Sequence, residues 1–216
     1  IIIMMMQRTP NESDDRRERF ERNEEAAHVE SLSLCRQNLA FIPTESLPGN
    51  LVSLDLSWNK LTDLGDLAKA CEHLKVLVLK HNCLQSIQGI HFHSNLKTLD
   101  VSNNKLNKLP DLKALPSLEI LDLSWNTIED LSSSIVDGVQ SPLPSSLQHL
   151  SLENNKITLL GDFRILVMCP QLVGLKVSGN PCVQECEEIE MEISVFFSFL
   201  LPQLSTLDAK LISESA

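Results

Sequence analysis

Apolar residues recur along the chain in blocks that each end on an asparagine. Within a block, three apolar residues stand eight, five and three places before the asparagine, as Leu51, Leu54 and Leu56 do before Asn59. The residues that end these blocks, at intervals of 23, 22, 22, 29 and 25, are Asn59, Asn82, Asn104, Asn126, Asn155 and Asn180. An earlier, imperfect block ends on Gln37. This spacing predicts a stack of about seven copies of one structural unit.

Each block predicts one short β-strand. Two leucines flank a single residue, as Leu54 and Leu56 flank Asp55, so the leucines point to one side and the residue between them to the other. One such strand cannot bury its apolar face alone, but seven stacked strands form a parallel sheet about 30 Å long. After each asparagine the apolar residues fall three apart, which predicts a 3₁₀ or short helical return on the opposite side. The six asparagines are interpreted as structural, because a buried amide both donates to and accepts from a turning backbone.

The repeated pattern LxxLxLxxN resembles the leucine-rich repeat family over about residues 29–212. The resemblance implies an α/β solenoid: a horseshoe with a concave parallel sheet of about seven strands, a 3₁₀ or short-helical convex side and a C-terminal helical cap. The period near 22 residues is similar to that of the intracellular subclass. Members of this subclass include phosphatase-1 regulators, the axonemal dynein light chain of the leucine-rich repeat type, centriolar and ciliary scaffolds, and the spliceosomal A-prime protein.

Three regions are predicted along the chain. Residues 1–28 form a charged N-terminal tail or a capping helix, residues 29–181 hold the repeats, and residues 182–216 form a C-terminal cap. Residues 132–146, which contain six serines, two prolines and one glycine, are a loop inserted into the repeats. This loop is either a tolerated insertion or a carrier of a partner contact or phosphorylation site.

The predicted cap has two parts. Residues 187–201 are expected to form an amphipathic helix whose aromatic side chains Phe196, Phe197 and Phe199 lie in the core. Residues 201–208, LPQLSTLD, resemble the cap motif LPxLxxLD of leucine-rich repeat proteins. A cap is required because the last repeat would otherwise expose a sheet edge and apolar core to water.

The charge balance narrows the classes of partner. The 216 residues carry a formal net charge of −11 and their basic residues form no cluster, so direct binding of nucleic acid is not expected. No apolar run reaches the ~18 residues of a membrane helix, and the apolar residues 1–6 are too few for the core of a secretory leader. The six cysteines are therefore expected to remain thiols, and the protein is expected to be intracellular and cytoplasmic.

No catalytic or phosphate-binding motif occurs, so neither an enzyme nor a bound cofactor is predicted. Two adjacent repeats contain a group of metal-ligand types: Cys71, His73, His81, Cys83, His91 and His93. Register places Cys71 and His93 on the return side, whereas His81 and Cys83 flank Asn82 at the opposite edge. Their spacing matches no strong zinc pattern, so these residues are interpreted as semi-buried fillers and no metal site is predicted.

The residues that point away from the leucines form the predicted binding surface. The central row, acidic in its middle, reads Ser33, Asp55, Val78, Asp100, Asp122, Ser151 and Lys176. The row before it, small or apolar, reads Ser31, Ser53, Val76, Thr98, Ile120, His149 and Gly174. The row just before the asparagines reads Arg36, Trp58, His81, Asn103, Trp125, Asn154 and Gly179.

Both tryptophans of the chain, Trp58 and Trp125, lie in the last of these rows, within two copies of the sequence LDLSWN. Three strand spacings separate them, about 14–15 Å. They either contact a partner together or lie flat over neighbouring side chains and shield the asparagines. The predicted partner-binding residues are Trp58, Trp125, Asp55, Asp100, Asp122, Val78 and His81.

These features predict a non-catalytic protein–protein interaction scaffold that binds a basic or amphipathic segment of a protein on its concave face. A similarity of residues 143–183 to the later repeats of centriole-capping leucine-rich repeat proteins extends this prediction to a cytoskeletal, ciliary or centriolar site. Two alternatives remain open: a regulatory subunit of an enzyme such as protein phosphatase-1, and a component of a ribonucleoprotein particle. No membrane association is predicted.

Overall fold

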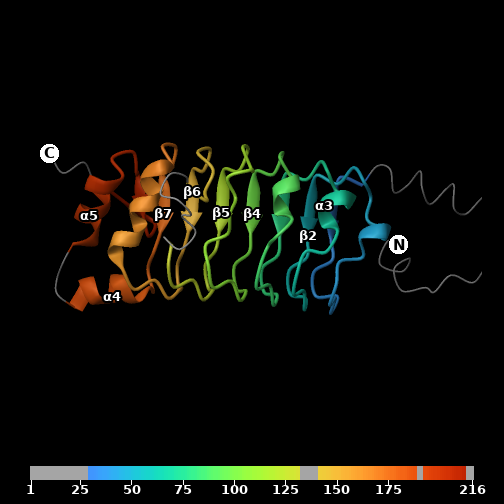
Figure 1. Cartoon of the computed structure of the whole chain (residues 1–216), viewed down its shortest axis with the longest axis horizontal. Coiled ribbons are helices and arrows are strands. Elements are labelled where there is room, and N and C mark those ends of the chain that lie inside the picture. Colours follow the sequence, from blue (N-terminus) through green and yellow to red (C-terminus); the bar gives the residue numbers. More distant parts are fainter. Residues whose placement is uncertain (1–28, 132–140, 189–191, 213–216) are drawn as a thin grey trace, which may run out of the picture.

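The computed structural model describes residues 29–131, 141–188 and 192–212. These residues form a solenoid in which each repeat adds one strand to a sheet and then returns behind it (Figure 1). The predicted tail, residues 1–28, lies outside the described residues, as do residues 132–140 of the predicted insertion.

A parallel sheet runs along the described chain. Its repeat strands, three residues each, are β1 (Ser31–Ser33), β2 (Ser53–Asp55), β3 (Val76–Val78), β4 (Thr98–Asp100), β5 (Ile120–Asp122), β6 (His149–Ser151) and β7 (Gly174–Lys176). Neighbouring strands pair without a shift, so each outward row predicted above is a straight line across the sheet. The predicted strand of every repeat is therefore confirmed.

The sheet continues past the repeats into the C-terminal segment, which the repeat pattern did not predict. Strand β8 (Thr206–Leu207) pairs in parallel with β7, and β9 (Lys210–Leu211) pairs antiparallel with β8. The letters Leu204-x-x-Leu207-Asp208 reproduce the start of an ordinary block, which explains why this segment adds a strand. Asp208 accepts hydrogen bonds through Oδ1 from the backbone N–H groups of residues 177 and 178, at 2.7 and 3.0 Å.

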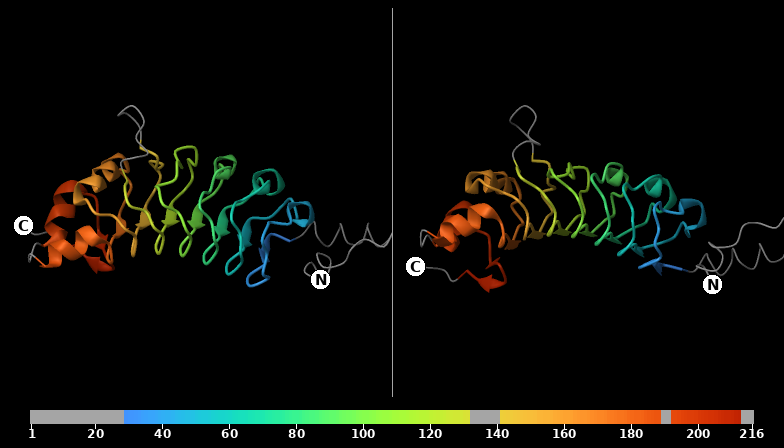
Figure 2. Two further views of the ribbon diagram at one scale, coloured as in Figure 1. Left: turned by 60° about the horizontal axis from the view of Figure 1, so that its bottom comes forward. Right: turned by 90° about the horizontal axis from the view of Figure 1, so that it is seen from below.

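The returning segments cover the opposite side of the sheet, as predicted for a 3₁₀ or short-helical convex side. The described helical turns among the repeats are η1 (Thr44–Ser46), α3 (Leu67–Ala70), η2 (Ile90–Phe92) and η3 (Leu160–Met168). A strand takes up less room along the solenoid axis than a helical turn does, so the sheet curves and its exposed face is concave (Figure 2).

Leucine side chains fill the space between the sheet and the convex side. Leu54, Leu77 and Leu99, from the middle of three adjacent strands, are 0 % exposed. At the C-terminal end two aromatic rings join this core: Phe163 of η3 packs edge-on against Phe197, with ring centroids 5.3 Å apart. Stacking of equivalent leucines thus gives one continuous core along the solenoid.

The six block-ending asparagines are buried and form a hydrogen-bonded ladder along one edge of the sheet. Asn82 is representative: its Nδ2 donates to the backbone oxygens of Leu56 and Leu79, at 3.0 and 2.8 Å, and its Oδ1 accepts from the N–H of Leu61 at 3.1 Å. Each amide therefore joins its own turn to the preceding repeat. Both the nitrogen and the oxygen of each amide thus bond to the backbone, as expected for structural residues.

The single helix expected over residues 187–201 is not observed in that form. Residues 187 and 188 are the end of α4 (Pro181–Glu188), a second helix α5 spans Ile193–Leu200, and the backbone of Glu192 before α5 is extended, with ψ 101°. Pro181 has no N–H and therefore suits the first turn of a helix, which explains why α4 begins directly after the last asparagine.

Of the cap aromatics expected in the core, only Phe197 is fully buried. Phe196 packs partly buried against the core, with its ring 5.2 Å from that of Phe197. Phe199 is 84 % exposed, so its predicted core position is wrong. A helix this short presents only one face to the solenoid, and Phe199, two residues beyond Phe197, lies on the other face.

Candidate functional site

The concave face carries the acidic row expected from the sequence. Asp55, Asp100 and Asp122 each end a strand and are half-buried. In each, Oδ1 accepts from the hydroxyl and the backbone N–H of the serine two residues later, with N–H distances of 2.9, 3.0 and 2.8 Å. These bonds fix the carboxylates against the sheet and leave Oδ2 for other contacts; Oδ2 of Asp55 accepts from the Ser33 hydroxyl at 3.2 Å.

The row that precedes the asparagines has a left-handed backbone throughout. Its residues, with φ between 53° and 74°, are Arg36, Trp58, His81, Asn103, Trp125, Asn154 and Gly179. Each turn is held in place by the next repeat; the N–H of Trp125, for example, donates to the oxygen of Glu153 at 2.9 Å. Glycine and asparagine tolerate this conformation, whereas other residues pay about 1–2 kcal/mol. Backbone energetics therefore does not account for a tryptophan at either position, and strain of this kind marks candidate functional residues.

The two tryptophans have different surroundings. The ring of Trp58 stacks on that of His81, with centroids 3.7 Å apart and planes 21° apart, and Cζ of Arg36 lies 5.1 Å from the Trp58 ring centre. Trp125 is 58 % exposed, and within the described residues it has no ring partner. Trp58 thus packs against His81 and Arg36 while 46 % of its side chain stays exposed, and Trp125 exposes a larger fraction without a ring neighbour.

The charge of the central row changes sign along the solenoid. Val78, half-buried on β3, interrupts the acids at one position, and the row is negative again at Asp100 and Asp122. At β7 it ends on Lys176, whose Nζ lies 3.6 Å from Oε2 of Glu153. That pair is loose and the Lys176 side chain is 51 % exposed, so the ammonium group remains open to an incoming anion.

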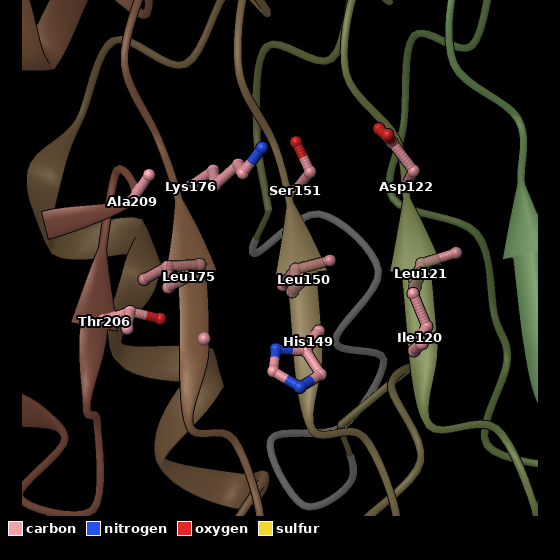
Figure 3. A pocket seen from close by; sticks show the side chains of 11 residues that line it. Ile120, Leu121, Asp122, His149, Leu150, Ser151, Leu175, Lys176, Thr206 and Ala209 are labelled. Atoms are coloured by element: carbon pink, nitrogen blue, oxygen red, sulfur yellow. The ribbon is translucent and has the colours of Figure 1, made fainter.

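A shallow hollow of about 220 Å³ lies on the concave face over β5 to β8. Among its lining residues, Ile120 of β5, His149 of β6 and Lys176 of β7 are exposed, and Figure 3 shows their side chains on three neighbouring strands. A Cβ atom at Gly174 would lie 2.4 Å from Nδ1 of His149, so the missing side chain is what leaves room for the imidazole ring. Thr206 of the cap closes the hollow at its far end.

The hollow was not part of the binding surface predicted from the sequence. Of the predicted partner-binding residues it contains only Asp122. Ile120, His149 and Gly174 are consecutive members of one outward row in the sequence. Two large side chains followed by a glycine could have indicated a hollow at this place. The contribution of Thr206 had no such signal, because β8 was not predicted.

Models of the leucine rich repeat match residues 72–128, 50–65 and 146–166 of the chain. These matches fall on the same blocks that form β2 to β6 in the structure. The chain is a leucine-rich repeat protein. Its sequence is 30% identical to human leucine-rich repeat-containing protein 56 over 166 residues, which make up 74% of this chain and 25% of that protein. The chain thus spans a quarter of the length of this relative.

Solved structures show the same leucine-rich repeat fold. A leucine-rich repeat protein of Leptospira interrogans superimposes with a TM-score of 0.64 and 27% identity, over 86% of this chain and 45% of that chain. A chain from the SNF/U2A' complex of Drosophila melanogaster superimposes with a TM-score of 0.51 and 26% identity, over 61% of this chain and 70% of that chain.

The cysteine and histidine residues of this leucine-rich repeat protein do not converge. All six cysteines are free thiols in the structure. Cys71 and His93 are buried on the convex side, whereas His73 and His91 are exposed, and among the described residues no group of three or more potential ligands could hold a metal ion. Burial raises the pKa of the Cys71 thiol to about 11 and lowers the pKa of His93, whose Nδ1 has no hydrogen-bond partner.

Proposed function

We propose that this leucine-rich repeat protein is a non-catalytic scaffold that binds a protein partner through its concave face. Family membership supports a binding role, and the concave face offers the chemistry for one: fixed carboxylates, an apolar hollow and exposed aromatic surface. In the described part of the chain no helix is long and apolar enough to cross a membrane.

Trp125 is the observation that supports the proposal most strongly. Its side chain is more than half exposed, its backbone is held in the left-handed region, and it lies in the same repeat as Asp122 and Ile120. Tryptophan is enriched among the residues that contribute most to protein–protein binding. A strained, exposed tryptophan in the same repeat as a half-buried carboxylate therefore fits a contact residue better than a residue needed for folding.

The test replaces each tryptophan with asparagine, which occupies the same left-handed row at Asn103 and Asn154 and keeps the backbone unchanged. Trp58→Asn, Trp125→Asn and the double variant are used as affinity baits beside the unaltered chain, and captured proteins are quantified by mass spectrometry. We expect Trp125→Asn to remove the specifically captured partner and Trp58→Asn to weaken its capture less, because the Trp58 ring already contacts His81 and Arg36 and exposes less of its surface. The far-UV spectrum should not change in any variant.

Phe92 provides the matched control. It is an aromatic residue of η2 that is 65 % exposed on the convex side, so Phe92→Asn removes similar apolar surface far from the concave face. Its capture profile should equal that of the unaltered chain. If the double tryptophan variant keeps the same partner at the same yield, the concave face is not the binding surface.

A second candidate, a component of a ribonucleoprotein particle, is favoured by the similarity to a chain of the SNF/U2A' complex. The net charge of −11 argues that a bound protein, rather than the repeat surface, would contact RNA in such a particle. Loss of the captured partners after RNase treatment would favour this candidate. The predictions of a phosphatase regulator and of a cytoskeletal, ciliary or centriolar site stay predictions, and phosphatase activity in the captured fraction is the measurement for the former.

A further inference from the structure

The charge of the outward residues along the concave face limits which kind of protein segment can bind there. Crossing the sheet from β4 to β7, the central row presents Asp100, Asp122, Ser151 and Lys176. Beside Ser151 the surface opens into the hollow around Gly174. The central row is therefore acidic at β4 and β5, carries a small uncharged residue at β6 and is basic at β7, and the hollow lies beside it over β5 to β8.

The spacing of these environments matches an α-helix laid across the strands. Parallel strands at about 4.8 Å place the four rows at about 0, 4.8, 9.6 and 14.4 Å. A helix rises about 1.5 Å per residue, so positions i, i+3, i+7 and i+10 lie at about 0, 4.5, 10.5 and 15 Å, within about 80° of one face. An extended peptide fits less well. Its side chains on one side are about 6.7 Å apart, so the third of them lies about 4 Å beyond the third row of the sheet.

We propose that the concave face binds one amphipathic α-helix of a protein partner, with basic residues at i and i+3, an apolar residue at i+7 and an acidic residue at i+10. This inference rests on the proposed function and deepens it. The basic residues face Asp100 and Asp122, the apolar side chain enters the hollow against Ile120 and His149, and the acidic residue faces Lys176. The positive N-terminal end of the helix lies toward the aspartates, which sets its direction.

The hydrogen bonds of the aspartates favour this arrangement. Oδ1 of Asp122 is held by the N–H and hydroxyl of Ser124, at 2.8 and 2.6 Å, so the carboxylate needs no reordering to receive a cation on Oδ2. The exposed side chain of Trp125 would flank the helix on the side of the asparagine ladder. A preordered anion beside an apolar surface lowers the entropy lost on binding.

The test uses two synthetic peptides and the full chain. Each peptide is a 14-residue, lactam-bridged, alanine-based helix with Lys at positions 2 and 5 and Leu at position 9, and the two differ only in Glu or Lys at position 12. Binding is followed by fluorescence anisotropy of a dye on the peptide. We expect the Glu peptide to bind about tenfold more tightly than the Lys peptide, because one attraction replaces one repulsion.

The decisive variant is Lys176→Glu, which should reverse the order of the two peptides. Lys156→Glu makes the same change in net charge at an exposed lysine outside the outward rows and should leave the order unchanged. Asp122→Asn keeps an oxygen to accept the Ser124 hydrogen bonds but removes the charge, and should weaken both peptides about two- to fivefold. Glu129→Gln, at an exposed position, is its control and should have no effect.

Three outcomes would overturn the inference: failure of both peptides to bind, equal binding of the two, or a reversal that Lys156→Glu also produces. Such a result leaves the proposed function intact if the Trp125→Asn bait still loses its captured partner, because the face would then bind a protein of different chemistry. If the peptide test fails and the tryptophan variants also keep the captured partner, the concave face is not a binding surface.

Discussion

Asn104, in the middle of the asparagine ladder, gives the sharpest test of how the solenoid is held together. Its Nδ2 donates to the backbone oxygens of Leu79, Val101 and Ser102, at 3.0, 3.0 and 3.1 Å, and its Oδ1 accepts from the N–H of Leu84 at 3.0 Å. The residue is 8% exposed, so these four hydrogen bonds are largely protected from water. We predict that Asn104→Ala lowers the free energy of unfolding by about 2–4 kcal/mol.

The magnitude depends on which groups keep a partner. The oxygens of Leu79 and Val101 also accept from the amides of Asn82 and Asn126, at 2.8 and 3.0 Å, so they are not left unpaired. The N–H of Leu84 has no such substitute among the described hydrogen bonds. A buried, unpaired N–H costs about 1–3 kcal/mol, and the weakened bonds to the shared oxygens account for about 1 kcal/mol more.

The assay is equilibrium unfolding in urea, followed by tryptophan fluorescence and by far-UV circular dichroism. Asn103→Gly is the matched control: it removes the neighbouring asparagine, which is half-buried, while glycine keeps the φ of 55° without strain. The control should change the free energy of unfolding by less than about 0.5 kcal/mol. A loss below about 1 kcal/mol for Asn104→Ala, or equal losses in the two variants, would refute the reasoning that the ladder amides satisfy buried backbone.

Two further predictions concern single positions. Gly179→Ala should lower the free energy of unfolding by about 1–3 kcal/mol in the same assay, because φ is +74° and the new Cβ would lie 2.3 Å from Oδ1 of Asn154; an unchanged urea midpoint would contradict this. Burial lowers the pKa of His93 below its ordinary value of about 6.5, so the unfolded chain binds a proton that the folded chain does not. Stability should therefore fall as the pH drops below about 6.5, and this fall should be smaller in His93→Leu when melting temperatures are measured from pH 7.5 to 5.

The sequence was sufficient for the framework because the framework is periodic. A leucine every two or three positions can be buried in only one way once the strands stack in register, so the strand of each repeat and the direction of Asp55 or Asp122 follow directly from the pattern. The same periodicity placed both tryptophans in one row. Three other members of that row, Asn103, Asn154 and Gly179, are residue types that tolerate the left-handed backbone found in the structure.

The cap is where the periodic argument failed. The backbone of Glu192 is extended, so the helix expected from residue 187 begins only at Ile193, and the outward position of Phe199 depends on how α5 lies against the last repeat. Neither feature repeats along the chain, so each is decided by a single packing arrangement that a hydrophobic pattern does not encode. Strand β8 is intermediate between these two situations. Its sequence resembles the start of a repeat block, but its pairing with β7 depends on the chain returning to the edge of the sheet.

The sequence by itself thus determined the solenoid, its strands and the rows of side chains on its concave face. The tertiary structure decided which members of those rows are available. The ring of Trp58 is stacked on that of His81, although its side chain is 46 % exposed, whereas Trp125 has no ring neighbour among the described residues. The hollow exists because Gly174 lies beside His149 and the cap adds Thr206. Periodicity sets the direction in which a side chain points, but its lateral contacts depend on rotamers and on neighbours about 22 or more residues away in the chain, and only folding brings those together.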